Sequence, residues 1–406
     1  HPRLAAHKAR AVGAGRTHRL TQTSFIAAQS ALSVVLVVAG ALLVRSLENV
    51  LAIPIGVEAD RLVFANVYFE PGEAPPDSMI ARTMSALEAR LAGDARVESM
   101  ARTRTAPMRG YSYFSHFPDG DSTRNFGRNA AAGSGVSKEY FVTTGMKFVR
   151  GAGFTSDSAA EVVINTRMAR VYWPDVDPIG RCLNLHKVSA PCSRVVGVVE
   201  PTRRMDVIEE EFGQFYTPIA GPGSEGSFGT TLILRTRPAA RASVAGSVRT
   251  LIKEAYPLGY PTVRAMTQNL DVQYRSWRTG ARLFSAFGLL ALIVAIIGVY
   301  SAVSYSVGRR HREFGVRMAL GARVRDVLNQ VVAEGLGAVA IGVAIGVGLS
   351  LVGGPLMASM LFGVEPRDLS ALMFAGCSML LVAGGASLLP ALRATRVDPA
   401  TALRSD

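Results

Sequence analysis

Residues 309–322 read R-R-H-R-E-F-G-V-R-M-A-L-G-A, a short basic segment between two long apolar runs. Its arginines cannot be placed in hydrocarbon, so the segment is expected in water or at the lipid headgroups. Phe314, Met318 and Leu320 add apolar contacts at roughly helical spacing, and Gly321 then offers a helix stop. We therefore predict a short surface helix with one face free to dock on another protein. From the physics alone, a solvated basic loop that only fixes the topology is the alternative.

Four apolar runs are long enough to cross a bilayer as helices. The first, residues 24–44, carries no charge and covers roughly 31 Å at about 1.5 Å per residue. The sequence thus predicts a membrane α-helical fold with four transmembrane helices and a large extracytoplasmic α+β domain inserted between helices 1 and 2. The expected spans are 24–44, 283–307, 331–351 and 371–390, with an outer loop at 352–370.

The net charge of +13 lies mostly in three segments that flank these spans. Residues 1–23, read as a flexible basic arm, residues 308–330, which contain the basic segment, and the tail 391–406 together hold 14 Lys or Arg and four acids. A basic excess beside apolar spans follows the positive-inside pattern and is not a nucleic-acid footprint. These three segments are expected on the same, cytoplasmic side of the membrane.

Residues 45–282 are too polar for a membrane and form the predicted outer domain. Strand and helix patterns indicate one β-α-β unit in about 46–107 and a second in about 229–270, read as halves of one subdomain. Residues 108–228 are expected to form a subdomain inserted between these halves. Helical apolar stripes support both units: they are Ile80, Met84, Leu87 and Leu91 in the first, and Val244, Val248, Leu251 and Ile252 in the second.

Cys182 and Cys192 lie ten residues apart in this polar region. A disulfide that closes the intervening hairpin is possible if the region lies outside the cytoplasm, and two free thiols are the alternative.

The third span carries small residues at every fourth position, which are Ala338, Gly342, Gly346 and Ser350. This spacing puts them on one helix face, so that another helix can approach closely. The partner helix could belong to the same bundle or to a second subunit.

The sequence indicates no enzyme: it predicts no catalytic residue, no cofactor-binding residue and no metal ligand. It contains no G-x-x-x-x-G-K-[ST] phosphate loop and no histidine pattern typical of zinc sites. His116 and His186 are expected at the solvated surface.

The run R-E-F-G-V-R-M-A-L-G-A at 312–322 resembles the cytoplasmic coupling segment of the FtsX-like permeases, the MacB type of ABC transporter subunit. The ending P-A-L-R-A at 390–394, followed by V-D-P at 397–399, resembles the same family. L-F-G-V at 361–364 resembles a motif of the duplicated orphan permeases of acidobacteria, so the chain is interpreted as the C-terminal half of such a protein.

The resemblance implies an ABC ATPase subunit as partner, with ATP bound by that separate subunit. It also implies a second permease unit, in a homodimer or a fused pseudo-dimer, and a multi-pass place in the bacterial cytoplasmic (inner) membrane with both termini cytoplasmic. The residues that it assigns to the ATPase contact are Arg312, Glu313, Phe314, Arg317, Met318, Leu320 and Gly321.

The expected function is that of a permease or mechanotransmission subunit, which couples a separate ATPase to the extracytoplasmic domain for export or efflux. The alternative is a membrane-anchored FtsX-like sensor or scaffold that signals without transporting.

Overall fold

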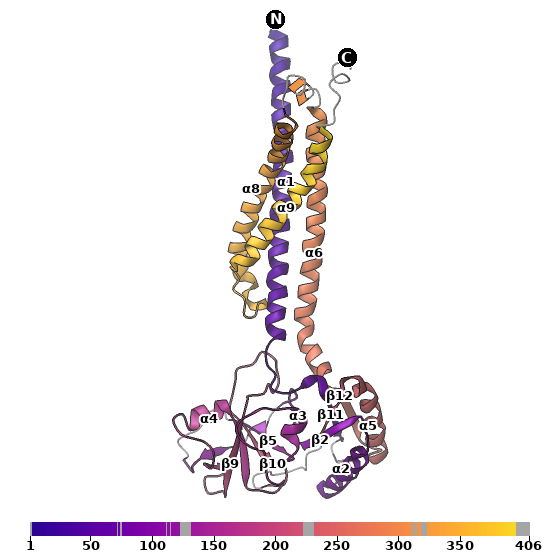
Figure 1. Cartoon of the computed structure of the whole chain (residues 1–406), viewed down its shortest axis with the longest axis vertical. Coiled ribbons are helices and arrows are strands. Elements are labelled where there is room, and N and C mark those ends of the chain that lie inside the picture. The colour runs from indigo at the N-terminus through magenta and orange to yellow at the C-terminus, as the bar shows by residue number, and fades with distance from the viewer. Residues whose placement is uncertain are drawn as a thin grey trace. The chain divides into compact units, whose positions relative to one another are not determined.

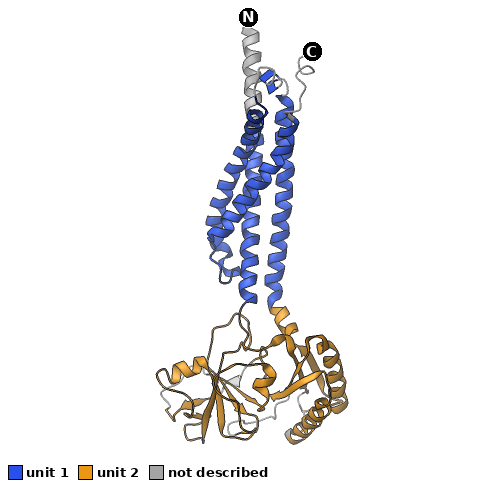
Figure 2. Ribbon diagram, in the orientation of Figure 1, with its two compact units in different colours: residues 1–52, 274–406 blue, residues 53–273 orange. Residues whose placement is uncertain are grey.

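The computed structural model describes most of the chain and divides it into two compact units (Figure 2). The first unit contains residues 1–52 and 274–406, and the second contains residues 53–273. The described residues are 2–394 except 71, 74, 111, 114, 122–130, 222–230, 311, 312, 315 and 318–322, and for residues 2–20 the backbone alone is described.

The first unit is a helix bundle (Figure 1). Among the described residues, four helices are long and apolar enough to cross a membrane, within Thr21–Leu51, Met266–Arg309, Val324–Met360 and Leu369–Arg393. The elements are α1 (Pro2–Leu51), α6 (Met266–Arg309), α8 (Val324–Gly353), the 3-10 helix η3 (Gly354–Met360) and α9 (Leu369–Ala394).

Two boundaries in the bundle differ from those expected. The first helix begins at Pro2, so the segment expected to be a basic arm before the helix is part of α1; its alanines, leucines and arginines are good helix formers. Pro390 does not end the last helix, which continues to Ala394. A proline removes one N–H donor, and membrane helices tolerate that interruption.

The second unit contains one sheet with short helices. Its helices are η1 (Ala59–Arg61), α2 (Asp77–Ala92), α3 (Tyr140–Thr144), α4 (Thr166–Tyr172), η2 (Pro238–Ala240) and α5 (Arg241–Ala255). Its strands are β1 (Leu62–Tyr68), β2 (Val97–Thr103), β3 (Ser112–Tyr113), β4 (His116–Pro118), β5 (Ala132–Val136), β6 (Phe148–Gly151), β7 (Glu161–Asn165), β8 (Cys182–Leu185), β9 (Cys192–Val199), β10 (Gln214–Pro218), β11 (Thr231–Thr236) and β12 (Tyr260–Ala265).

The strand order in the described sheet is β12-β1-β11-β2-β5-β10-β7-β9-β8-β4, with β3 on β5 and β6 on β9. The two β-α-β units interleave, because β11 lies between β1 and β2, and β1 lies between β11 and β12. Helices α2 and α5 pack on this end through the predicted apolar stripes, of which only Leu251 is partly rather than fully buried. Helix α4 packs near the other end against β7, β9 and β10.

The predicted fold class is confirmed: four candidate membrane helices surround, in the chain order, a large domain inserted after the first of them.

Candidate functional site: the segment between helices α6 and α8

Phe314 packs against the bundle and anchors the described part of the coupling segment, residues 310, 313, 314, 316, 317 and 323. Its backbone N–H donates to the carbonyl of Arg310 at 3.0 Å, which continues the helical turn beyond α6. Its side chain is 2% exposed and lies in the same apolar core as Val307 and Val331. The ring is therefore a contact within the bundle.

An ionic network attaches the same segment to α8. Arg310 Nη1 lies 2.9 Å from Oε1 of Glu334, and Arg317 Nη2 lies 2.7 Å from Oε1 of Glu313. Arg317 Nη1 also donates to Oε1 of Gln330 at 2.9 Å, and Gln330 Nε2 donates to Glu334 at 3.5 Å. Each partly exposed pair contributes little alone. Together the five residues, named here the arginine–glutamate network, join the segment to α8 at two points.

The structure brings part of the predicted contact set together. Glu313 and Arg317 lie in the network, and Val316 beside them is exposed. Their assignment to an ATPase contact stays a prediction, as does that of Phe314. The remaining members of the set lie outside the described residues: Arg312, Met318, Leu320 and Gly321.

Sequence reasoning missed three members of the network: Arg310, Gln330 and Glu334. Glu334 is the single acid beside the third apolar run, and the excess of arginine just before that run offered it a partner. Opposite charges that face each other across a short connection are the signal that could have found this pair.

The small-residue face of α8 lies against α1. A Cβ added at Gly342 would lie 2.5 Å from the carbonyl oxygen of Ala27, and one added at Gly346 would lie 2.7 Å from that of Ala31. Ala338 and Ser350 on the same face are buried. The sequence did not decide whether the partner of this face belongs to the same bundle or to a second subunit. In the structure the partner is α1 of the same chain.

A loop of the second unit, residues 201–209, binds both of the chain's connections to the bundle; we name it the tether loop. The N–H of Arg203 donates to the carbonyl of Ile55 at 3.0 Å, just after α1. Gln273, on α6, accepts the N–H of Val207 at 2.7 Å and donates to the carbonyl of Met205 at 2.6 Å. One loop therefore holds the segment after α1 and the beginning of α6.

The tether loop is stiffened by one carboxylate. Glu209 Oε2 accepts the N–H groups of Met205 at 3.1 Å and of Asp206 at 3.2 Å, and Oε1 accepts that of Arg204. Gly56 passes so close that an added Cβ would lie 2.5 Å from the carbonyl oxygen of Pro201. Hydrogen bonds to a charged acceptor are stronger than neutral ones, so this loop is well defined.

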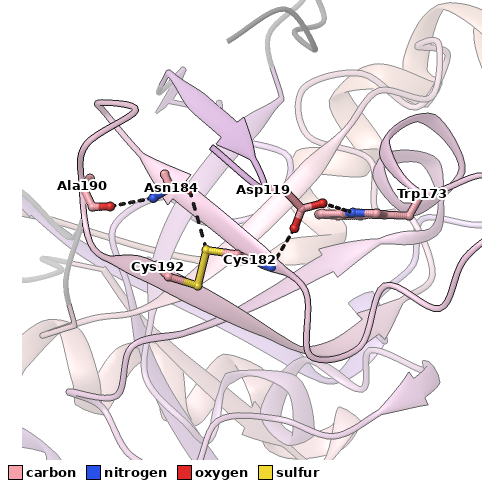
Figure 3. The surroundings of a disulfide bond; sticks show 6 residues. All are labelled: Asp119, Trp173, Cys182, Asn184, Ala190 and Cys192. Atoms are coloured by element: carbon pink, nitrogen blue, oxygen red, sulfur yellow. Dashed lines mark hydrogen bonds between the residues drawn. A yellow bond between two sulfur atoms is a disulfide. The ribbon is translucent and has the colours of Figure 1, made fainter. Parts of the chain in front are cut away.

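A disulfide joins Cys182 and Cys192 across the β8–β9 hairpin, with Cα atoms 5.4 Å apart (Figure 3). Asp119 supports the hairpin, since its carboxylate accepts the indole N–H of Trp173 at 2.9 Å and the N–H of Cys182 at 3.3 Å. Asn184 donates to the carbonyl of Ala190 at 2.6 Å and closes the turn.

The described residues contain no group of three or more His, Cys, Asp or Glu that could hold a metal ion. The expectation that His116 lies at the solvated surface is wrong. Its ring is buried, and Nε2 lies 2.5 Å from the hydroxyl of Tyr172. Burial in the core around β4 and α4 raises the pKa of that hydroxyl. A neighbouring aromatic hydroxyl thus satisfies the histidine within the core.

Two family models match the chain. The MacB-like periplasmic core domain matches residues 30–251, and the FtsX-like permease C-terminal model matches residues 285–399.

Curated relatives match over about two thirds of the chain. A probable export ATP-binding/permease protein of Pseudomonas fluorescens is 30% identical over 67% of this chain and 43% of its own length. A macrolide export ATP-binding/permease protein MacB of Acinetobacter baylyi is 32% identical over 66% of this chain and 42% of its own length. A probable syringafactin export ATP-binding/permease protein of Pseudomonas syringae is 30% identical over 70% of this chain and 46% of its own length. The chain therefore spans less than half the length of these relatives.

Among solved structures, the periplasmic region of MacB from Actinobacillus actinomycetemcomitans matches with a TM-score of 0.39 and 16% identity, over 55% of this chain and 97% of that one. The family models carry the classification: the first alone spans more than half of the 406 residues, and the second covers the helices after the inserted domain. The chain is a multi-pass membrane protein of the FtsX-like permease family with a MacB-like periplasmic core domain.

Proposed function

We propose that the chain is the permease subunit of an ABC export complex and passes the motion of an ATPase to its extracytoplasmic domain. The observation that carries this proposal is the coupling segment. Phe314 fixes it in the bundle core, while Val316 and the charged pair Glu313–Arg317 remain accessible beside that anchor. A partner that moves the accessible side would move α6 and α8 with it.

The tether loop supports the second half of the proposal. It binds Ile55 after α1 and Gln273 on α6, so a shift of either connection reaches the inserted part of the sheet through hydrogen bonds. Transmission of motion from the helices to the sheet needs a continuous series of contacts between them. These hydrogen bonds supply such contacts.

The partners follow from the family. The 406 residues contain no P-loop, so we propose that a separate subunit binds ATP. The relatives are named ATP-binding/permease proteins and are more than twice as long as the matched part. A second permease unit completes the complex in this proposal, which places the protein in the bacterial inner membrane with both termini in the cytoplasm.

Capture of the tagged full-length protein from membranes in mild detergent tests the proposal, with vanadate-sensitive ATP hydrolysis of the eluate as the readout. Arg317→Glu reverses a charge in the network and places two acids together. The captured hydrolysis should fall about tenfold, which corresponds to about 1.4 kcal/mol lost at the contact with the ATPase. Arg325→Glu is the matched control, since Arg325 is exposed on the first turn of α8 outside the network.

Both variants should insert into the membrane and unfold at the temperature of the wild type. Equal hydrolysis with Arg317→Glu and Arg325→Glu would remove the assignment of the coupling segment. Recovery of an outer-face partner alone, without any nucleotide-hydrolysing subunit, would favour the sensor or scaffold and contradict export.

A further inference from the structure

The bundle contains an apolar groove whose outer end is charged. It has a volume of about 560 Å³ and is formed by α1, α6 and α9. Gly40 on α1 and Gly288 on α6 form part of its wall, and Ala41 and Phe374 add apolar surface. At one end the lining changes to Arg45 and Glu48, which directly follow the apolar part of α1. The groove therefore has the polarity of an amphiphile.

A polar pocket of about 680 Å³ continues from that charged end. It shares Arg45 and Glu48 with the groove and adds Glu365, Arg367 and Asp368 from the loop before α9. Arg45 and Glu48 line both spaces, so the two adjoin just after the apolar part of α1. An apolar space and a charged space in this order match an acyl chain and its headgroup.

The charges in the pocket indicate the headgroup. Arg45 is paired with Asp368 and also donates to Ser370. Glu48, Glu365 and Arg367 form no ion pair with any residue that the structure describes. One unpaired cation and two unpaired anions fit a ligand with both signs, in which a phosphate lies toward Arg367 and an ammonium toward the carboxylates.

We propose that this groove binds one zwitterionic phospholipid of the outer leaflet with a primary-amine headgroup. Its acyl chain lies between α1, α6 and α9, and its ammonium lies between Glu48 and Glu365. An apolar groove in the membrane-spanning part of a bundle faces lipid tails. An acyl chain that enters the groove therefore stays in an apolar environment. The carboxylates disfavour an anionic headgroup and supply the selectivity.

The test places the full-length protein in vesicles of phosphatidylethanolamine and phosphatidylglycerol at equal amounts. After mild solubilisation, native mass spectrometry measures the phosphatidylethanolamine and phosphatidylglycerol retained by each protein. The wild type should retain the amine lipid about threefold to fivefold above the glycerol lipid, which corresponds to one partly exposed ion pair. Glu48→Gln should reduce this ratio toward one, whereas Glu73→Gln in the second unit should leave it unchanged.

A second variant fills the groove. Ala41→Phe places a ring in the apolar part and should reduce the total lipid retained, while Val352→Phe, on an exposed position of α8, should not. Thermal unfolding of each variant shows that it is folded. Equal lipid ratios in the wild type, or equal retention by Ala41→Phe and Val352→Phe, would overturn the proposal. If a second copy of the chain covers the groove instead, the lipid ratios and the lipid retention will be equal, and Ala41→Phe will weaken a dimer.

Discussion

Phe314 and Val316 stand two positions apart in the coupling segment and lie in opposite environments. The ring of Phe314 is buried in the bundle core, whereas 46% of the Val316 side chain is exposed. The residue composition of the segment did not separate these roles, because an apolar residue in a short amphipathic helix suits a core or a partner equally well. Only the position of the segment beside α6 and α8 decides which residue faces inward.

Phe314→Ala should therefore lower the stability of the bundle. Replacement of a buried phenylalanine by alanine removes apolar contacts and leaves a cavity, which costs about 3–5 kcal/mol. Thermal unfolding of the purified protein in detergent measures the effect. Val316→Ala is the control and should change the midpoint little; equal shifts for the two variants would contradict the burial of the ring.

Asp94 offers a prediction on pH dependence. Arg96 donates to its carboxylate from the side chain at 2.7 Å and from the backbone at 2.9 Å, and chiefly the side-chain bond lowers the pKa of Asp94 to about 2. A carboxyl with a depressed pKa in the folded state stabilises that state at neutral pH. This contribution is lost as the pH falls from about 4 toward 2.

Asp94→Asn should thus unfold at a lower temperature than the wild type at pH 6, and the difference should shrink as the pH falls from about 4 and vanish only below about 2. The measurement is the unfolding midpoint of the purified protein across this range. Asp175→Asn, at an exposed position, serves as the control. A difference that is independent of pH would show that the charge of Asp94 is not involved.

At the scale of the elements, the contact between α1 and α8 determines the bundle. A stripe of small residues on α8 lets the two backbones approach closely. A Cβ atom added at a glycine of this stripe would collide with a backbone carbonyl oxygen of α1. The stripe was readable because four-residue spacing on a helix defines one face. Its partner was not readable, since the same face suits any apolar helix.

Gly342→Leu should disrupt this contact, and Gly348→Leu should not. A Cβ at Gly342 would meet Ala27, whereas a Cβ at Gly348 has nothing within 4 Å. The gain in helix propensity is the same at both positions, so the difference between the variants isolates packing. Overpacking costs about 1–3 kcal/mol. Thermal unfolding in detergent measures it, and equal midpoints would place the α8 face against lipid instead of α1.

The sheet shows where sequence reasoning ended. The apolar stripes of α2 and α5 followed from helical periodicity. The order β12-β1-β11-β2 did not follow, because pairing between strands so distant in the chain has no local signal. The tether loop was also missed: it acts mainly through backbone N–H and C=O groups, which every sequence has.

At the scale of the whole molecule, the proposed transmission of motion runs through two connections, and the tether loop binds both. Gln273 contributes two hydrogen bonds with opposite directions, one to the N–H of Val207 and one from its own amide to the carbonyl of Met205. A coupling route through α6 requires these bonds to persist while the helix moves.

Gln273→Glu should keep the acceptor and lose the donor, and Gln273→Ala should lose both. Hydrogen exchange at residues 203–209 should therefore accelerate modestly in the first variant and more in the second, because each neutral hydrogen bond contributes about 1 kcal/mol. In the assembled complex, export should fall in the same order while basal ATP hydrolysis stays unchanged. Unaltered exchange in Gln273→Ala would exclude the loop as a link.

The place of β1 in the sheet has a consequence for biogenesis. Both of its neighbours, β11 and β12, come more than 160 residues later in the chain. At a synthesis rate of about 5–20 residues per second, the hydrophobic strand L-V-F-A-N-V-Y waits roughly ten to thirty seconds for its first partner edge. During that interval the strand presents an unpaired hydrophobic edge, which favours aggregation. We therefore expect a holding chaperone to improve the yield of this domain until residue 265 has emerged.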